Sequence, residues 1–149
     1  MRAVVQRVKH SSVTVGGELI SEISKGLNVL IGAQKSDTQQ DVKYMANKIA
    51  ALRVFEDNEG KLNLSVKDIG GEVLLVSQFT LLGDARKGNR PSFINAAGYE
   101  EGKKLCEMLL EELCLMGIKT GYGVYGADMN VLIENDGPVT ILIDSRKIF

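Results

Sequence analysis

Two short polar runs carry the residues of this chain that could take part in chemistry. The first, Ser77-Gln78-Phe79-Thr80-Leu81, follows an apolar segment, so its amides lie where a predicted strand ends. Amides that a sheet leaves unpaired can stabilise a developing oxyanion. The hydroxyls of Ser77 and Thr80 and the side chain of Gln78 could orient a carbonyl or a ribose. An ordinary strand end with polar caps has the same residue types, so both interpretations stay open.

The second run, Asn135-Asp136-Gly137-Pro138-Val139-Thr140, contains one of only two prolines in the chain. Glycine before proline relieves the steric restriction on that position, and it lets another backbone or a ligand approach closely. One interpretation is therefore a main-chain feature of special geometry. The other is a plain hairpin turn between strands at about 129–134 and 139–144, since only about 5–6% of X-Pro bonds in folded proteins are cis.

The side chains that usually catalyse hydrolysis are mostly missing from the sequence. His10 is the one histidine, and its place between two predicted strands favours a solvated turn residue over a catalytic base. Cys106 and Cys114 are eight residues apart in a helical pattern, about 12 Å along the axis, which is too far for a disulfide. We expect both to be buried apolar residues in a reducing cytoplasm. These three residues cannot form a zinc site of the usual spacing, so we predict neither a metal nor a cofactor.

A basic loop follows the first polar run. Arg86-Lys87-Gly88-Asn89-Arg90-Pro91 carries three cations in five positions. It is either a solvated surface loop or a small patch that contacts phosphates of RNA through Arg86, Lys87 and Arg90. The whole chain has 18 basic and 19 acidic residues. No overall field therefore attracts a nucleic acid, and any contact with RNA must come from a local patch such as this one.

The elements that position these runs belong to one predicted domain over 1–149, of the α+β class. We expect largely antiparallel sheet, barrel-like or in two sheets, packed with two main helices. Strands are predicted at 2–8, 11–15, 18–23, 27–33, 62–66, 72–77, 119–125, 129–134 and 139–144, with a hairpin turn at Gly16-Gly17. The first helix begins at a capping box, Ser36-Asp37-Thr38-Gln39, and buries Val42, Met45, Ala46, Ile49 and Leu52. The second covers about 99–116, with Gly117 at its C′ position.

Targeting signals are not recognisable in the sequence. No stretch approaches the ~20 apolar residues that a membrane-spanning helix needs. The N-terminal residues read as a charged strand and lack the apolar run of a signal peptide. The cytoplasmic location that we predict follows from the two unpaired cysteines.

The motifs together resemble the D-aminoacyl-tRNA deacylases, and the resemblance covers nearly the whole chain. It is carried, in order, by Val5-Gln6-Arg7-Val8, Ser12-Val13-Thr14-Val15, Ser77-Gln78-Phe79-Thr80-Leu81, Arg90-Pro91-Ser92-Phe93, Gly126-Ala127-Asp128-Met129 and Asn135-Asp136-Gly137-Pro138-Val139-Thr140. Each motif alone is weak evidence, but the order of the motifs, their spacing and the chain length all match those of the family. Tyr125 departs from the phenylalanine expected before Gly126, although the ring is kept.

The resemblance implies a homodimer that hydrolyses the ester between a D-amino acid, or glycine, and the terminal adenosine of tRNA. It implies that Gly137-Pro138 is cis and reaches into the pocket of the partner subunit, where its carbonyls meet the α-amino group of the substrate, and that Arg7 holds this step. Ser77, Gln78, Phe79 and Thr80 would line the reaction centre, while Tyr125 and Met129 would flank the terminal adenine.

The chemistry of such a site follows from what the sequence lacks. A threonine nucleophile needs a base, and no histidine or lysine lies near Thr80 in the sequence. We therefore expect the amides of Phe79 and Thr80 to stabilise the oxyanion while a ribose hydroxyl of the RNA helps to activate water. Two other functions remain as alternatives: a non-catalytic RNA- or protein-binding module of the same fold, and a general small-molecule esterase.

Overall fold

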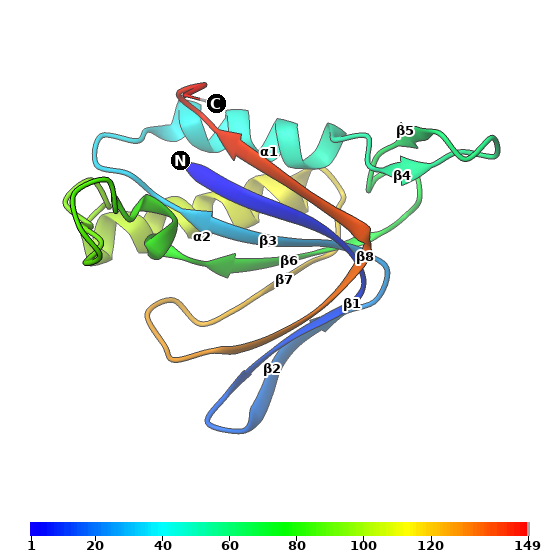
Figure 1. Ribbon diagram of the computed structural model, residues 1–149. Coiled ribbons are helices and arrows are strands. Elements are labelled where there is room, and N and C mark those ends of the chain that lie inside the picture. The colour runs from blue at the N-terminus through cyan, green and yellow to red at the C-terminus, as the bar shows by residue number, and fades with distance from the viewer. Residues whose placement is uncertain (149) are drawn as a thin grey trace.

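The computed structural model describes residues 1–148, which form a curled sheet with two helices on one side (Figure 1). In chain order the elements are β1 (Arg2–Val15), β2 (Glu18–Ile23), β3 (Gly26–Gly32), α1 (Gln39–Ala51), β4 (Phe55–Glu56), β5 (Leu62–Leu64), β6 (Glu72–Ser77), the short 3-10 helix η1 (Phe79–Leu82), α2 (Tyr99–Leu115), β7 (Thr120–Tyr122) and β8 (Asn130–Asp144). The predicted α+β class with two main helices is confirmed.

The main sheet is mixed, and β1 pairs with three of its strands. The strands run in the order β2-β1-β3-β6-β7, and β8 also pairs with β1. All three pairings of β1 are antiparallel, whereas β3–β6 and β6–β7 are parallel. Parallel neighbours need a long crossover, and α1 and α2 provide these two connections. Strands β4 and β5 form a separate small antiparallel pair.

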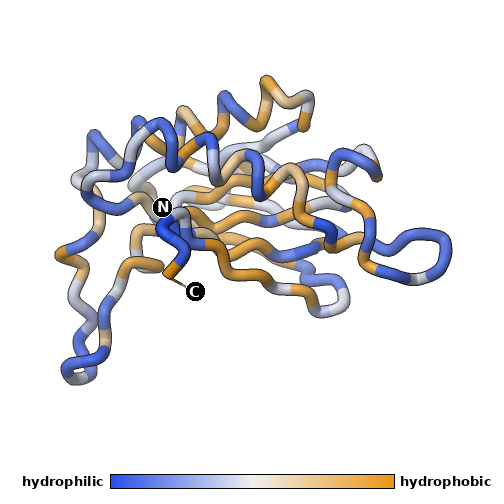
Figure 2. The backbone as a smooth tube through the Cα atoms, turned by 90° about the horizontal axis from the view of Figure 1, so that it is seen from above, coloured by the Kyte–Doolittle hydropathy of each residue, from blue (hydrophilic) through white to orange (hydrophobic). Residues whose placement is uncertain are grey.

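The central strands are buried on both faces, as is typical of parallel strands. Val73 and Leu75 of β6 belong to the core shared with the two helices. The alternate residues Leu74 and Val76 belong to a second cluster inside the curl of the sheet, together with Val8 and other residues of β1 and β2. In Figure 2 the tube alternates between apolar and polar colours along the helices, which is the pattern of helices with one buried face.

Helix α1 begins two residues later than the sequence suggests. Its N-cap is Thr38, whose side chain accepts from Gln40 N, and the capping box is completed by Asp41 at the third helical position. The predicted box beginning at Ser36 is therefore wrong. Asp37 instead accepts from Gln34 N at 2.6 Å and forms an ion pair of 2.8 Å with the α-amino group of Met1. Within residues 1–148, no helix is both long and apolar enough to cross a membrane.

Two pairs of segments that we predicted as separate strands are single strands in the structure, because their pairing with other strands continues through the residues between them. The predicted strands 2–8 and 11–15 are parts of one strand, β1, and His10 lies inside it, paired with Glu134. Likewise the predicted strands 129–134 and 139–144 form one strand, β8, which begins at Asn130 and runs through Gly137-Pro138, so this step is not a hairpin turn. The Gly16-Gly17 turn is confirmed, with both glycines at positive φ. The predicted C′ position of Gly117 is confirmed as well, since the C-cap of α2 is Met116 and Gly117 has a positive φ.

Candidate active site

A cavity of about 590 Å³ opens where β3 and β6 end. Five predicted site residues line it: Ser77, Gln78, Phe79, Tyr125 and Met129. Thr80 follows directly in η1, and the side-chain amide of Gln78 donates to its hydroxyl. The structure therefore brings together the first polar run and the segment before β8, which are about fifty residues apart in the sequence.

The turn from β6 into η1 leaves two main-chain amides unpaired. Gln78 N still donates to Ile31 O of β3, at 2.7 Å, and Leu81 N donates back to Gln78 O at 3.2 Å. Among residues 1–148, the amides of Phe79 and Thr80 between them have no hydrogen-bond acceptor, as expected for the first turn of a helix. Two adjacent free donors at the mouth of a cavity suit the binding of a negatively charged oxygen.

One wall of the cavity is an aromatic pair that the sequence did not indicate. The rings of Tyr99 and Tyr125 meet edge to face, with centroids 5.2 Å apart, and Tyr99 OH donates to Tyr125 O at 3.3 Å. Gly102 of α2 leaves the space that the Tyr125 hydroxyl occupies. Tyr99 was expected only as the start of α2. Phe79, which also lines the cavity, forms a second edge-to-face pair with Phe93, with ring centroids 5.1 Å apart.

Cys106 of α2 also lines the cavity. Burial, aided by the charge of Glu107, raises the pKa of its thiol to about 12, so the thiol is neutral at physiological pH and a poor nucleophile. Burial likewise raises the pKa of the Tyr122 hydroxyl. Both cysteines are free, as predicted, but Cys114 is exposed rather than buried because it faces away from the core side of α2.

The Gly137-Pro138 step lies in a bulge of β8, away from the cavity. Gln6 pairs with Thr140 and Val8 pairs with Asn135, so the four residues 136–139 lie opposite Arg7 alone. The peptide bond before Pro138 is cis, and both residues of the step are exposed. Proline is tolerated in a strand at such bulges and at sheet edges.

The side chains of Arg7 and Asn135 hold the bulge in place. Arg7 donates from Nη1 to Val54 O at 2.7 Å and from Nε to Asp136 O at 3.1 Å. Asn135 accepts from Val139 N at 2.9 Å and donates to the Thr140 hydroxyl at 3.0 Å. Gly137 has φ +124°, a conformation that favours glycine, and a Cβ there would lie 2.8 Å from Arg7 Nη2. The step is therefore a rigid, exposed main-chain feature.

Within one chain, this step and the cavity lie at opposite ends of the strands. Arg7, opposite the bulge, pairs with Leu27, and Leu27 pairs with Val73 at the start of β6. The cavity is at the other end, where Ile31 pairs with Ser77. Leu27 and Ile31 are four residues apart on β3, so the bulge and the cavity are separated by about 13 Å along the strands. A chain therefore does not place its own Gly137-Pro138 in its own cavity.

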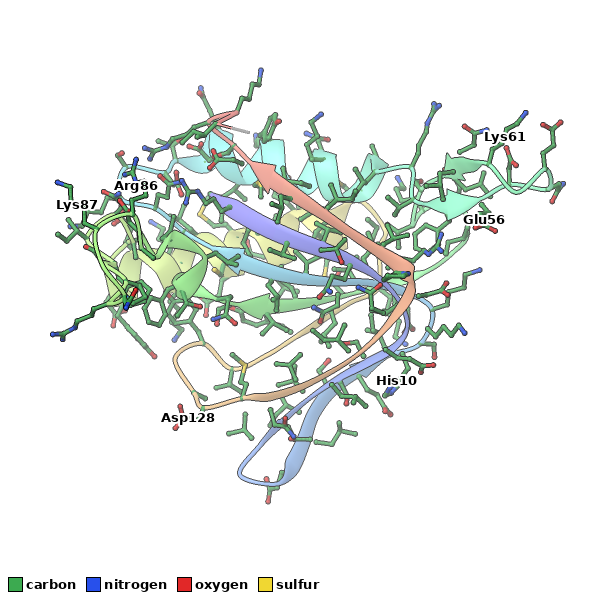
Figure 3. The ribbon with its side chains drawn as sticks, viewed as in Figure 1. His10, Glu56, Lys61, Arg86, Lys87 and Asp128 are labelled. Atoms are coloured by element: carbon green, nitrogen blue, oxygen red, sulfur yellow. The ribbon has the colours of Figure 1, made fainter. Side chains whose placement is uncertain are left out.

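The remaining predicted residues lie outside the cavity. Arg86 forms a two-point ion pair with Asp84, which holds the pKa of that carboxyl well below its usual range. Figure 3 shows Arg86 and Lys87 projecting from the loop after η1, while Lys61 lies at the opposite end of the molecule. His10 contacts Glu22 at 3.5 Å on the outside of β1, and it is not close to the cavity residue Asp128 in Figure 3. Arg90 is exposed in the same loop as Arg86.

Comparison with known proteins gives a consistent result over the full length. A family model described as D-Tyr-tRNA(Tyr) deacylase matches residues 4–144. A protein of Thermoanaerobacter pseudethanolicus named D-aminoacyl-tRNA deacylase is 60% identical over 149 residues, which is all of both chains. A protein of the same name from Clostridium perfringens is 57% identical, again over the whole of both chains.

Two solved structures share the fold. One, described as c-Myc DNA Unwinding Element Binding Protein, is 47% identical, covers 97% of this chain and 98% of its own, and has a TM-score of 0.91. The other is described as a probable eukaryotic D-amino acid tRNA deacylase and is only 14% identical. It covers 95% of this chain and 97% of its own with a TM-score of 0.81, a likeness of fold alone.

Proposed function

The chain belongs to the D-aminoacyl-tRNA deacylase family, and from that premise we propose that it hydrolyses D-aminoacyl-tRNA in the cavity at the end of β6. The products are the free amino acid and tRNA. The observation that carries this proposal is the pair of unpaired amides of Phe79 and Thr80 beside an aromatic-lined cavity. Such a site can bind both an ester oxyanion and a nucleoside.

In the proposed complex, the terminal adenosine lies between Tyr125 and Met129 and the ester carbonyl points to the two amides. Hydrolysis then proceeds through a tetrahedral intermediate: water adds to the carbonyl carbon, negative charge develops on the carbonyl oxygen, and the ribose oxygen leaves with a proton. Ser77 and Gln78 orient the ester and ribose. The vicinal ribose hydroxyl of the RNA helps to activate the water. Among the described residues that line this cavity there is no histidine or lysine, and the one carboxylate is that of Asp128.

Selection of the D-amino acid is proposed to come from main chain rather than from a side-chain pocket. A pocket for one side chain discriminates by only about 10–200-fold per methylene and would not accept many different D-amino acids. Rigid carbonyls pressed against the α-carbon exclude the L side chain by collision and leave the D side chain in open space. Glycine has no side chain to exclude, so it is expected to be a substrate as well.

We propose that a second copy of the chain supplies those carbonyls through Gly137-Pro138, which makes the active protein a homodimer. Two features support this arrangement. The step is exposed and held rigidly by Arg7, and it lies at the opposite end of the strands from the cavity of its own chain. We further propose that residues 1–149 act as one domain in the cytoplasm, where aminoacyl-tRNA is used.

The test is to measure amino-acid release from one tRNA charged with either D-tyrosine or L-tyrosine. We expect rapid release of the D-amino acid and no release of the L-amino acid above the spontaneous rate. Absence of cleavage of the D-substrate, despite binding, would favour a non-catalytic RNA-binding module. Equally fast cleavage of simple D-amino-acid esters that lack RNA would favour a general esterase.

A further inference from the structure

A second cavity, of about 700 Å³, lies next to the first on the other side of η1. The chain itself connects the two: 31–33 line the first cavity and Gln34, Lys35 and Ser36 line the second. Likewise Phe79, at the start of η1, lines the first cavity, and Leu82, at its end, lines the second. A ligand that passes over η1 could therefore occupy both.

The polar groups of this second cavity are mostly hydrogen-bond donors with positive charge. Among the described residues that line it, four are cations, Arg2, Lys35, Arg86 and Arg146, and one, Asp84, is an acid. Asp144 and Asp37 hold two of the guanidinium groups in place: Arg2 Nε is 2.8 Å from Asp144, and Arg146 Nη2 is 3.2 Å from Asp37. Both carboxylates have fully buried side chains, so they orient the arginines without facing a ligand.

Two further observations at the same place indicate a binding site. Gln34 is only 5% exposed, and its side-chain nitrogen has no hydrogen-bond acceptor among the described residues. Buried donors normally have a partner. Ser36, next to it in the cavity wall, has φ +65°, a strained conformation for a residue other than glycine, and Arg146 Nη2 donates to its hydroxyl at 3.2 Å. Strain of this kind gathers at binding sites.

We propose that this second cavity binds backbone phosphates of the acceptor arm of tRNA while the aminoacylated 3′ end occupies the first cavity. A phosphodiester carries a negative charge that suits the surplus of cations in this cavity, and its oxygens supply an acceptor for the side-chain nitrogen of Gln34. The exposed loop cations Lys87 and Arg90 extend the same basic surface beyond the cavity. The inference rests on the proposed function, because it takes the nucleic acid to be the substrate of the neighbouring cavity.

The test compares two substrates in wild type and in Lys35→Gln and Arg86→Gln variants. One substrate is D-tyrosyl-tRNA, and the other is D-tyrosyl-adenosine, which has no acceptor arm. Both side chains are exposed and neither lines the first cavity. The matched control is Lys61→Gln, an exposed lysine at the opposite end of the molecule (Figure 3).

Each cavity variant is expected to raise the KM for D-tyrosyl-tRNA about 3- to 10-fold at low salt and to lower the slope of log Kd against log salt by about one. The kcat, and all values for D-tyrosyl-adenosine, are expected to stay at the wild-type level. Lys61→Gln is expected to change neither substrate.

Wild-type KM values for D-tyrosyl-tRNA in both cavity variants would overturn the inference while leaving the proposed function intact. Failure of the wild type on D-tyrosyl-adenosine and on D-tyrosyl-tRNA alike would instead contradict the proposed function. Inorganic phosphate and an uncharged acceptor hairpin are tested as competitors. Competition by the hairpin supports the RNA site, whereas competition by phosphate alone would assign the cavity to a small anion and contradict the inference.

Discussion

Arg7 and Asp136 face each other across the bulge between β1 and β8 and are joined by two contacts. Arg7 Nε lies 3.1 Å from the main-chain oxygen of Asp136 and 3.3 Å from its carboxylate. The same guanidinium donates from Nη1 to Val54 O at 2.7 Å. The Arg7 side chain is only 9% exposed, and its bonds to Asp136 and Val54 connect the bulge to the buried Val54. We therefore expect the orientation of Gly137-Pro138 to depend on Arg7.

Replacing Arg7 with Met is expected to lower the free energy of unfolding by about 2–4 kcal/mol. The substitution leaves the carbonyls of Val54 and Asp136 without their donor in a mostly buried place, and each such loss costs about 1–3 kcal/mol. Urea denaturation measures the change. In the same variant the release of D-amino acid from tRNA is expected to fall at least tenfold, because the main-chain step is no longer held in one position.

The matched control is Arg53→Met, which removes an exposed arginine near the same β4 region. Its unfolding free energy is expected to change by less than about 0.5 kcal/mol. Equal stability losses in the two variants would show that charge removal, rather than the contacts with Val54 and Asp136, is responsible.

A second prediction concerns Gly137, where φ is +124° and a Cβ would lie 2.9 Å from Val139 Cγ2. Gly137→Ala is expected to displace the bulge, because an L-residue is strained in this conformation and its methyl group collides with the Arg7 side chain. The ratio of D- to L-tyrosine release from one tRNA is the measurement. We expect this ratio to fall by at least tenfold.

Gly16→Ala serves as the control for backbone strain alone. Gly16 also has a positive φ, of +58°, but a Cβ there would meet nothing within 4 Å. It is expected to lower stability by about 1 kcal/mol and to keep the wild-type D-to-L ratio. A wild-type ratio in Gly137→Ala as well would contradict a role of this step in chiral selection.

The strand end at Ser77–Thr80 could be predicted because its signals are local. An apolar run stops, polar residues follow, and the chain must leave the sheet there. The bulge in β8 could not be predicted in the same way. Gly-Pro between two apolar segments indicates a turn, whereas pairing with β1 continues on both sides of it, through Asn135 and Thr140. That outcome depends on a partner strand more than a hundred residues away.

Tyr99 and the second cavity could not be predicted for the same reason: both depend on contacts between residues that are far apart in the sequence. Tyr99 joins the cavity wall only because α2 packs against the segment after β7, where Tyr125 lies. Arg2, Lys35 and Arg146 come together from the two ends of the chain and from the β3–α1 connection. No periodicity or motif places such residues side by side. In contrast, the predicted capping box was misplaced by only two residues, from Ser36 to Thr38, since several side chains there can cap a helix.

A third prediction concerns the two cysteines and alkaline pH. In the folded protein at pH 8, a thiol reagent such as DTNB is expected to modify Cys114 quickly and Cys106 only after unfolding. The reason is that Cys106 is buried and burial raises its pKa to about 12, so almost no thiolate forms. Two equivalents reacting rapidly under native conditions would contradict this burial.

The same raised pKa has a consequence for stability. The thiol of Cys106 ionises near pH 8.5–9 in the unfolded chain but near 12 in the folded one. The stabilisation of the folded state by the neutral thiol is therefore fully present below about pH 8.5, and it is lost as the pH rises towards 12. Urea denaturation at pH 8 and pH 10 is expected to show lower stability at pH 10. In Cys106→Ala this decrease is expected to be smaller, by the part that the thiol contributes.

The last prediction separates the hydroxyl of Thr80 from its amide. Thr80→Val removes the hydroxyl that accepts from the Gln78 side chain but keeps the main-chain N–H at the same place. If the amides of Phe79 and Thr80 stabilise the oxyanion, kcat for D-tyrosyl-tRNA is expected to fall less than about tenfold, the value of one ordinary hydrogen bond. Single-turnover release of D-tyrosine measures the step directly.

Thr80→Ser is the matched control, since it keeps a hydroxyl and is expected to retain nearly the wild-type rate. A nucleophilic Thr80 would give a different pattern. Release would then stop in Thr80→Val, with folding and tRNA binding unchanged, while Thr80→Ser would stay active and accumulate an acyl-enzyme in the first turnover. That pattern would show that Thr80 acts by covalent catalysis and would contradict catalysis by the main-chain amides alone. Within residues 1–148, the lining of the cavity contains no histidine or lysine, so a nucleophilic Thr80 would have to use the carboxylate of Asp128 as its base.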